Sequence, residues 1–290
     1  MSFTLTYITV KIPNFAHSVY VGIGVYVSYT FAKIMHYSPY LGFPVAFLVG
    51  GVISVIVFQF VVQPIVRMGG GRVTLTVSTI AVQIFLIAFL DIYTYWLRVK
   101  YQQYTALFML KGEDFKFGGY PGILIVSVVF CVTVIIFLYR LLTKTNIGIA
   151  MMATAEDKEL ASILGININR VQMIAWFLTG GLACISGAML PFWFVSTTTL
   201  GGTMMTSIMA GSLLGGLNNV YGAIIGGFGI GITEIIGTRF LQGVWGVWVG
   251  EYRSIIPMLI LVVILLIEPR GLQPIYDKIK NIYEIWGKNK

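Results

Sequence analysis

Long apolar stretches, separated by short charged segments, divide this chain of 290 residues. They lie at 17–35, 40–66, 73–97, 122–142, 171–195, 203–217, 220–241 and 254–267. Several exceed the roughly 20 residues that a helix needs to cross a bilayer. Hydrophobic residues make up 57% of the chain and charged residues only 10%, against about 25% in a soluble domain. We therefore predict an all-α, polytopic integral membrane protein, which excludes a soluble enzyme and a compact nucleic-acid-binding domain.

The number of crossings depends on two short segments. Residues 203–217 could form either a full span or a half-span buried in protein. Residues 1–10, MSFTLTYITV, have the composition of half a span, so the first transmembrane segment is expected to be truncated. Because no basic region or cleavage site accompanies them, they do not form a signal peptide. We expect about eight to nine transmembrane segments in a single domain, 1–290.

The charged residues set the expected orientation. Of the 30 charges, 21 lie in the segments 98–116, 140–170 and 268–290. Lys and Arg in short loops mark the cytoplasmic side. A cytoplasmic tail 268–290 places segment 143–170 on the same side and loop 98–121 outside, with twelve basic residues inside and seven outside.

Segment 143–170 contains the pattern of a short capped helix. Thr154 is suited to an N-cap, Asp157 follows three positions later as in a shortened capping box, and Gly165 suits a left-handed C-terminal position. These residues predict a helix over 155–164. Since so short a helix is marginal alone in water, we expect it to dock, either on this protein and its lipid or on a partner.

Four short elements follow one another along nearly the whole chain. They are NFAH at Asn14–His17, ATAEDKELASILGIN at Ala153–Asn167, LLGGLNNVYGAIIGG at Leu213–Gly227 and EPRGL at Glu268–Leu272. In this order they resemble the permease subunits of ABC importers for branched-chain amino acids, of the LivH/LivM type. The resemblance implies a multi-pass subunit of a prokaryotic cell membrane that carries branched-chain or other hydrophobic amino acids.

The resemblance also implies partners. They are two ABC ATPase subunits, a second homologous permease and an extracytoplasmic substrate-binding protein. The segment matching 153–167 would be the coupling helix that docks on an ATPase subunit. Its expected residues are Thr154, Glu156, Asp157, Leu160 and Gly165. Because the sequence has no Walker A motif, ATP is expected on the partner subunits. This chain itself is expected to have no catalytic residues and to bind no cofactor or metal.

Two alternatives remain open. One is a permease of the same family for urea or short amides. The other is an autonomous secondary carrier or channel, which would need ionisable residues within the membrane. Asp91 and Glu234 lie inside apolar stretches, near their expected outer ends. Asn14 and His17 are further candidates for a substrate pathway, or else residues of the membrane interface.

Glycines crowd the late apolar stretches. Gly222 with Gly226, and Gly227 with Gly231, form small-xxx-small pairs that let helices approach closely. Such pairs fit either the wall of a translocation path or helix packing alone.

Two further pairs of residues, one acidic and one aromatic, are each best explained by a structural role. Glu113 and Asp114 could be metal ligands, but as an isolated pair they are better explained by a solvated outer loop. Trp245 and Trp248, close to Arg253, fit an aromatic belt at the membrane interface.

Overall fold

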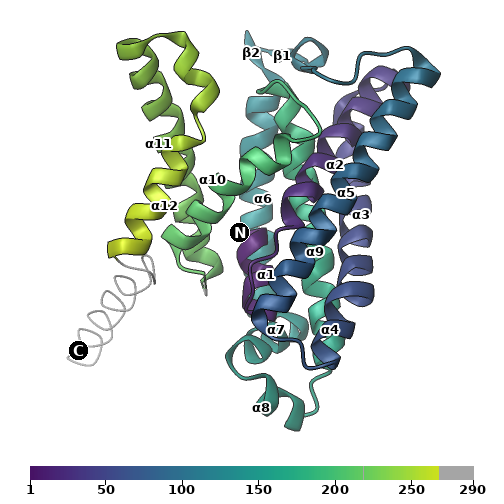
Figure 1. Cartoon of the computed structure of the whole chain (residues 1–290), viewed down its shortest axis with the longest axis vertical. Helices are drawn as coiled ribbons and strands as arrows, with labels where there is room; N and C mark the ends of the chain where they lie inside the picture. The colour runs from purple at the N-terminus through teal and green to yellow at the C-terminus, as the bar shows by residue number, and fades with distance from the viewer. Residues whose placement is uncertain (218, 268–290) are drawn as a thin grey trace. The chain divides into compact units, whose positions relative to one another are not determined.

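The computed structural model describes residues 1–217 and 219–267, so the predicted tail 268–290 and its EPRGL element lie outside the described residues (Figure 1). Within the described part the chain is almost entirely helical. Its regular strands there are two residues each, β1 (Lys116–Phe117) and β2 (Tyr120–Pro121), and they pair antiparallel. The predicted all-α class is confirmed.

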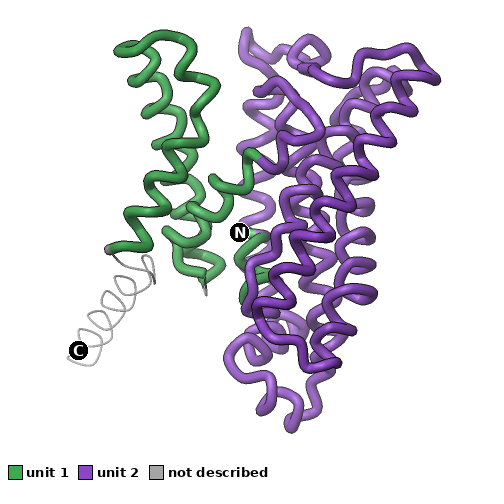
Figure 2. The backbone as a smooth tube through the Cα atoms, in the orientation of Figure 1, with its two compact units in different colours: residues 1, 3–8, 203–290 green, residues 2, 9–202 purple. Residues whose placement is uncertain are grey.

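The chain divides into two compact units, coloured separately in Figure 2. Unit 2 contains residues 2 and 9–202, and unit 1 contains residues 1, 3–8 and 203–290. The first helix, α1 (Ser2–Val10), has residues in both.

Unit 2 contains most of the long helices. They are α2 (His17–Tyr29), α3 (Gly42–Val57), α4 (Gln63–Arg67), α5 (Arg72–Tyr101), α6 (Gly122–Lys144), α7 (Asn146–Glu156), α8 (Lys158–Ile163) and α9 (Ile168–Met189). Shorter helical turns are η1 (Thr30–Ile34), η2 (Pro39–Leu41), η3 (Phe58–Val62), η4 (Lys111–Glu113) and η5 (Leu190–Phe192). The turns η1 and η3 are π-helical and continue α2 and α3.

The core of unit 2 forms where α9 packs against α2 and α3. Glycine allows these helices to touch backbone to backbone. A Cβ atom on Gly24 would lie 1.8 Å from the carbonyl oxygen of Cys184, and one on Gly50 would lie 2.4 Å from that of Gly180. Farther along α9, Trp176 is fully buried and its ring lies 5.5 Å from that of Phe58.

Unit 1 is built mainly from α10 (Leu200–Gly215), α11 (Val220–Trp245), the 3-10 turn η6 (Val247–Tyr252) and α12 (Ile255–Ile267). Of α10, the residues from 203 onward belong to this unit. Asn219 caps α11, since its Oδ1 accepts hydrogen bonds from the amides of Tyr221 (3.0 Å) and Gly222 (3.1 Å).

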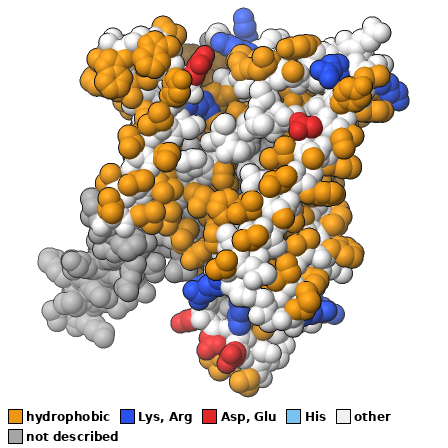
Figure 3. Space-filling view, viewed as in Figure 1, with side chains coloured by type: hydrophobic (Ala, Val, Ile, Leu, Met, Phe, Trp, Pro, Cys, Tyr) orange, Lys and Arg blue, Asp and Glu red, His pale blue; other side chains and the backbone are white. Residues whose placement is uncertain are grey.

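Five helical runs in the described residues are long and apolar enough to cross a membrane. They are Pro39–Arg67, Arg72–Tyr101, Gly122–Lys144, Ile168–Phe192 and Val220–Trp245. Apolar side chains cover much of the visible helix surface in Figure 3. They are exposed along α5, α6 and α11, as expected of helices that face lipid. The chain is therefore a multi-pass membrane protein.

Candidate coupling segment and polar sites of the membrane helices

The segment after α6 turns sharply into α7. Thr145 caps α7, because its Oγ1 accepts a hydrogen bond from the amide of Gly148 at 3.1 Å. Gly148 itself lies against the end of α6, where an added Cβ would be 1.9 Å from the carbonyl oxygen of Leu141. The close approach fixes the direction in which α7 leaves α6.

The next helix, α8, begins three residues later than the sequence pattern predicted. Asp157, not Thr154, is its N-cap: the Asp157 Oδ1 accepts from the amides of Glu159 (2.9 Å) and Leu160 (3.0 Å). The predicted cap was wrong because Thr154 lies buried inside α7, where its hydroxyl donates to the carbonyl of Ala150 at 2.7 Å. An aspartate cap also places its negative charge at the positive end of the helix dipole.

The C-terminal end of α8 agrees with the prediction for Gly165, whose φ is +82°. The amide of Ile166 bonds the carbonyl of Ala161 and the amide of Gly165 bonds that of Ser162, each at 3.0 Å. This pair of bonds is a Schellman motif, which needs a left-handed residue at the glycine position. Both ends of the six-residue helix are thus closed by local hydrogen bonds.

The surface of α8 is apolar and exposed. Leu160, Ile163 and Leu164 are 55%, 82% and 71% exposed, whereas Ala161 is buried at 2% and anchors the helix. The acidic side chains of Glu156 and Glu159 are exposed beside them. Figure 3 shows acidic and apolar side chains together at the end of unit 2 that α7 and α8 form. We name Leu160, Ile163 and Leu164 the apolar tip.

Two basic residues lie near the base of this segment. Burial lowers the pKa of Lys158, the first residue of α8, and the positive charge of Lys11 lowers it further. Burial also lowers the pKa of Lys11, whose backbone is left-handed with φ +60°. The chain that precedes α2 therefore passes close to the start of α8.

Asn14 and His17 form a compact turn that starts α2. The Oδ1 of Asn14 accepts from the amide of Ala16 at 3.1 Å, and the Nε2 of His17 lies 3.4 Å from the Oγ of Ser2. Asn14 and His17 are both buried. The side chain of Tyr20, which is also buried, interacts with that of Asn14. The turn brings the two predicted residues together at a polar site inside unit 2.

The two acids singled out in the membrane stretches differ in environment. Asp91 is exposed on α5. Glu234 of α11 is mostly buried: its Oε1 lies 3.5 Å from Nε of Arg253, and its Oε2 accepts a hydrogen bond from Ser207 at 2.8 Å. Burial lowers the pKa of Arg253, an effect that Glu234 opposes. Sequence reasoning missed this pair because Arg253 was assigned to the aromatic belt, and only the η6 turn brings it back to α11.

The late glycines divide into two groups. Gly222 and Gly226 lie against α10, where an added Cβ would be 2.0 Å from the carbonyl oxygen of Gly215 and 2.2 Å from that of Gly211, respectively. Among the described residues, a Cβ on Gly227 or Gly231 would meet no atom within 4 Å other than those of its own helix backbone.

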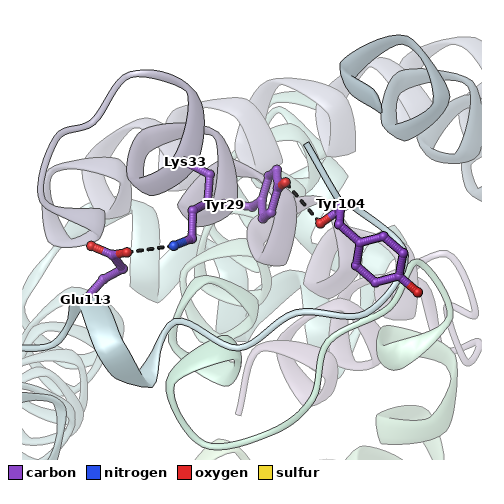
Figure 4. Close-up of polar contacts among 4 residues, drawn as sticks. All are labelled: Tyr29, Lys33, Tyr104 and Glu113. Atoms are coloured by element: carbon purple, nitrogen blue, oxygen red, sulfur yellow. Dashed lines mark hydrogen bonds and ion pairs between the residues drawn. The ribbon is translucent and has the colours of Figure 1, made fainter. Parts of the chain in front are cut away.

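The connection 98–121 is held by polar contacts with neighbouring helical segments (Figure 4). Lys33 Nζ lies 2.7 Å from Glu113 Oε1, and the Tyr29 hydroxyl donates to the backbone carbonyl of Tyr104 at 3.2 Å. The hydroxyl of Tyr40 donates to Asp114. Among the described residues, no three His, Cys, Asp or Glu side chains are grouped to hold a metal ion.

Comparison with known proteins identifies the family. A family model described as the permease component of branched-chain amino acid transport systems matches residues 1–265. The probable branched-chain amino acid transport permease LivH of Methanocaldococcus jannaschii is 34% identical over 283 residues, 97% of this chain and 90% of that protein. LivH of Escherichia coli is 30% identical over 129 residues, 44% of this chain and 40% of that protein. BraD of Pseudomonas aeruginosa, also such a permease, is 24% identical over 288 residues, 94% of this chain and 89% of that protein. No solved structure matches the chain.

The family match covers most of the chain, and the archaeal relative aligns with nearly all of it. Both agree with the resemblance that the four sequence elements indicated. The family consists of membrane permease subunits and not of enzymes. This chain belongs to the family of permease components of branched-chain amino acid transport systems.

Proposed function

We propose that the chain is the permease subunit of an ATP-driven ABC importer for branched-chain or other hydrophobic amino acids. The cargo named for the LivH and BraD relatives supports this assignment. Two ABC ATPase subunits would bind and hydrolyse ATP, and a second homologous permease would form the other half of the pore. An extracytoplasmic binding protein would deliver the cargo, and this chain would hold no cofactor of its own.

The proposed topology has about eight to nine crossings in one permease domain, 1–290. The five long helical runs supply most of them, and the shorter α2, α10 and α12 supply the rest, with α1 as a further candidate. The C-terminal tail 268–290 and segment 143–170 are cytoplasmic, and loop 98–121 is outside. The bias of basic residues toward the proposed inner side supports this orientation in the plasma membrane of a prokaryote.

The apolar tip of α8 is the observation that carries the proposal. The six-residue helix and its C-cap Leu164 leave three large apolar side chains exposed, although the helix is held at both ends by its own hydrogen bonds. Because the exposure of such side chains to water is costly, their function is best explained by a second surface. We place a groove of an ATPase subunit there, contacted by Glu156, Asp157, Leu160 and Gly165. Thr154, buried in α7, would support the segment from within.

The route from ATPase to pore follows the chain. The α7 helix packs on the end of α6 through Gly148, and α8 leads through Gly165 into α9. A displacement of α8 on ATP binding would therefore act on α6 and α9, and α9 is packed backbone to backbone on α2 and α3. Rigid-body motion of packed helices of this kind is a common way to switch a membrane protein between states.

Asn14, His17 and Glu234 remain the proposed polar residues of the substrate pathway, because buried polar groups in membrane helices are costly and tend to be functional. Asp91, exposed on α5, is the weaker candidate. Gly222 and Gly226 would hold α11 against α10, where the backbone of Gly227 also lies beside Gly211, and Gly231 would lie on the more open side of α11.

The assembly with the ATPase tests the proposal. Glu156→Lys combined with Leu160→Asp reverses one charge and puts another on the apolar tip, so we expect co-purification of the ATPase to fall about tenfold or more. The matched control is Glu251→Lys with Val247→Asp, two exposed residues of the outer turn η6. We expect wild-type yield from the control. Wild-type ATPase yield from the first double variant would contradict the coupling assignment.

A pull-down of the full chain from mild detergent tests the subunit composition. We expect ATP-binding subunits together with a second permease. Recovery of the chain alone, with substrate flux in liposomes that lack ATP, would instead show a self-sufficient carrier.

A further inference from the structure

Unit 2 contains a long groove between α2 with η1, α3 with η3, and α5, helices that pack side by side (Figure 1). Its volume is about 630 Å³. The floor of the groove is buried, since Tyr26, Val57 and Leu90 are 1%, 6% and 5% exposed. The groove is open along one side, where its rim is aromatic and exposed and includes Phe60, Phe85 and Phe89.

The walls of the groove are apolar, and the hydroxyl groups among them already have hydrogen-bond partners. These hydroxyl groups belong to Tyr26, Thr30 and Tyr93. The Tyr26 hydroxyl donates to the backbone carbonyl of Thr105 at 3.0 Å. The Oγ1 of Thr30 donates to the carbonyl of Tyr26 at 2.7 Å and lies 2.8 Å from the hydroxyl oxygen of Tyr93. Because a polar ligand would gain little here for the hydration that it loses, the walls fit a hydrocarbon chain.

The length of the groove is that of one lipid tail. On α5 its lining runs from Val82 to Tyr93, which is roughly 17 Å of helix at 1.5 Å per residue. Each leaflet supplies about 15 Å of hydrocarbon, half of the bilayer core. Tyr93 lies toward the end of α5 that enters connection 98–121, which the proposed topology places outside. The groove thus extends through about one leaflet, the outer one in that topology.

A cation lies just beyond this end of the groove. The face of α5 that lines the groove continues past Tyr93, at helical spacing, with Trp96 and Lys100. The ring of Trp96 stacks on that of Tyr93 with their centroids 6.1 Å apart, and the Nζ of Lys100 lies 4.8 Å from the centroid of Trp96. Lys100 is exposed and forms no ion pair within the described residues. Its charge is therefore available to a headgroup that lies above the groove.

We propose that the groove binds one acyl tail of an anionic phospholipid, whose phosphate lies at Lys100. Charge complementarity selects the headgroup, because a basic residue at the membrane surface attracts anionic lipids. The buried floor and the exposed rim enclose the tail, which distinguishes this site from lipid that only covers a convex helix surface. The site does not depend on the cargo or on the ATPase, and only the choice of leaflet depends on the proposed topology.

Photo-labelling of the wild-type chain is the first test. The chain in nanodiscs of phosphatidylcholine receives a trace of phosphatidylglycerol whose tail carries a diazirine, and labelled residues are identified by mass. We expect label on the groove lining of α3 and α5. Replacing the phosphatidylcholine by phosphatidylglycerol with the same tails should lower this labelling about fivefold. Labelling that is equal in the two lipids, or that is spread evenly over the exposed faces of α5 and α6, would overturn the proposal.

Filling the groove is the second test. Val49 of α3 is half-buried in the lining, so we expect Val49→Trp to lose most of the label on α5. The matched control is Val52→Trp, the same substitution on an exposed residue of the same helix outside the lining. We expect the control to label like wild type. Equal labelling in the two variants would mean that the tail does not lie in the groove.

The contact with the headgroup is tested without changing the groove. Lys100→Gln should abolish the preference for phosphatidylglycerol. Arg98→Gln is the matched control, because Arg98 is an exposed cation on another face of α5 and should leave the preference in place. A preference that survives Lys100→Gln, or that is lost equally in both variants, would overturn the assignment of the phosphate to Lys100.

A protein could cover the groove instead of a lipid. The labelling is therefore repeated on the complex that is recovered from mild detergent. We expect the groove to be labelled there as in the chain alone. Label that is present in the chain alone and absent from the complex would overturn the lipid proposal in favour of a partner's helix.

Discussion

The two long connections of unit 2, 98–121 and 143–170, both carry acidic side chains but use them differently. In the first, Glu113 pairs with Lys33 and Asp114 accepts a hydrogen bond from Tyr40. The Oδ2 of Asp114 also accepts from the amide of Ile123 at 3.2 Å, which closes the connection onto the start of α6. Its acids thus fasten the loop to the helices on either side.

In segment 143–170 only Asp157 is used in this way, as the cap of α8. Glu156 and Glu159 are exposed and form no ion pair within the described residues, and the apolar tip is exposed beside them. The helix is well formed, yet it contributes little burial to its own protein. A helix that is closed by its own hydrogen bonds but leaves its apolar side chains exposed is typical of a segment that binds a partner, whereas the acids of connection 98–121 serve its own fold.

The largest effect should come from the apolar tip. We expect Ile163→Asp to weaken ATPase binding about tenfold or more, because it puts a charge on a side chain that is 82% exposed here and buried in the proposed complex. The matched change in connection 98–121, Leu107→Asp, also acts on an exposed apolar residue. It should leave ATPase binding unchanged. An equal loss of ATPase binding in both variants would mean that the two connections do not differ in their contact with the ATPase.

A smaller effect is expected from the cap of α8. Asp157→Ala should lower the stability of helix α8 by about 1 kcal/mol. It should also speed hydrogen exchange at the amides of Glu159 and Leu160, which donate hydrogen bonds to the Asp157 side chain in the wild type. Asp157→Asn keeps the acceptor and should exchange almost as slowly as wild type. Unchanged exchange in Asp157→Ala would show that the cap does not hold the helix.

The smallest effect should come from the ion pair of Lys33 and Glu113. Lys33→Met removes an exposed pair, which contributes about 0.2–1 kcal/mol. We expect a slightly lower Tm in detergent, a difference that shrinks at high salt, and full ATPase yield. A loss of ATPase binding would show that this connection, too, serves the partner.

Local signals in the sequence were enough to predict much of the fold. Apolar length and composition predicted helices that cross a membrane, and Gly165 was assigned to a left-handed position from its place after an apolar helical pattern. The prediction of Thr154 as the N-cap was wrong because Thr154 and Asp157 are both residue types that cap helices well. In the structure α7 continues past Thr154 to Glu156, so that Asp157 is the first non-helical residue and becomes the cap of α8.

Long-range contacts could not be predicted in this way. The pair of Glu234 and Arg253 depends on how η6 folds back, and the contact of Gly24 with Cys184 joins helices far apart in the chain. No spacing within one helix encodes either contact.

Site-specific photo-cross-linking of the assembled importer tests the central claim most directly. A photoreactive residue replaces Ile163 in one preparation and Leu107 in another, and the cross-linked products are identified by mass. We expect position 163 to label an ATPase subunit and position 107 not to label one. Labelling of only lipid or this chain from position 163 would contradict the claim that the apolar tip is the docking surface for the ATPase.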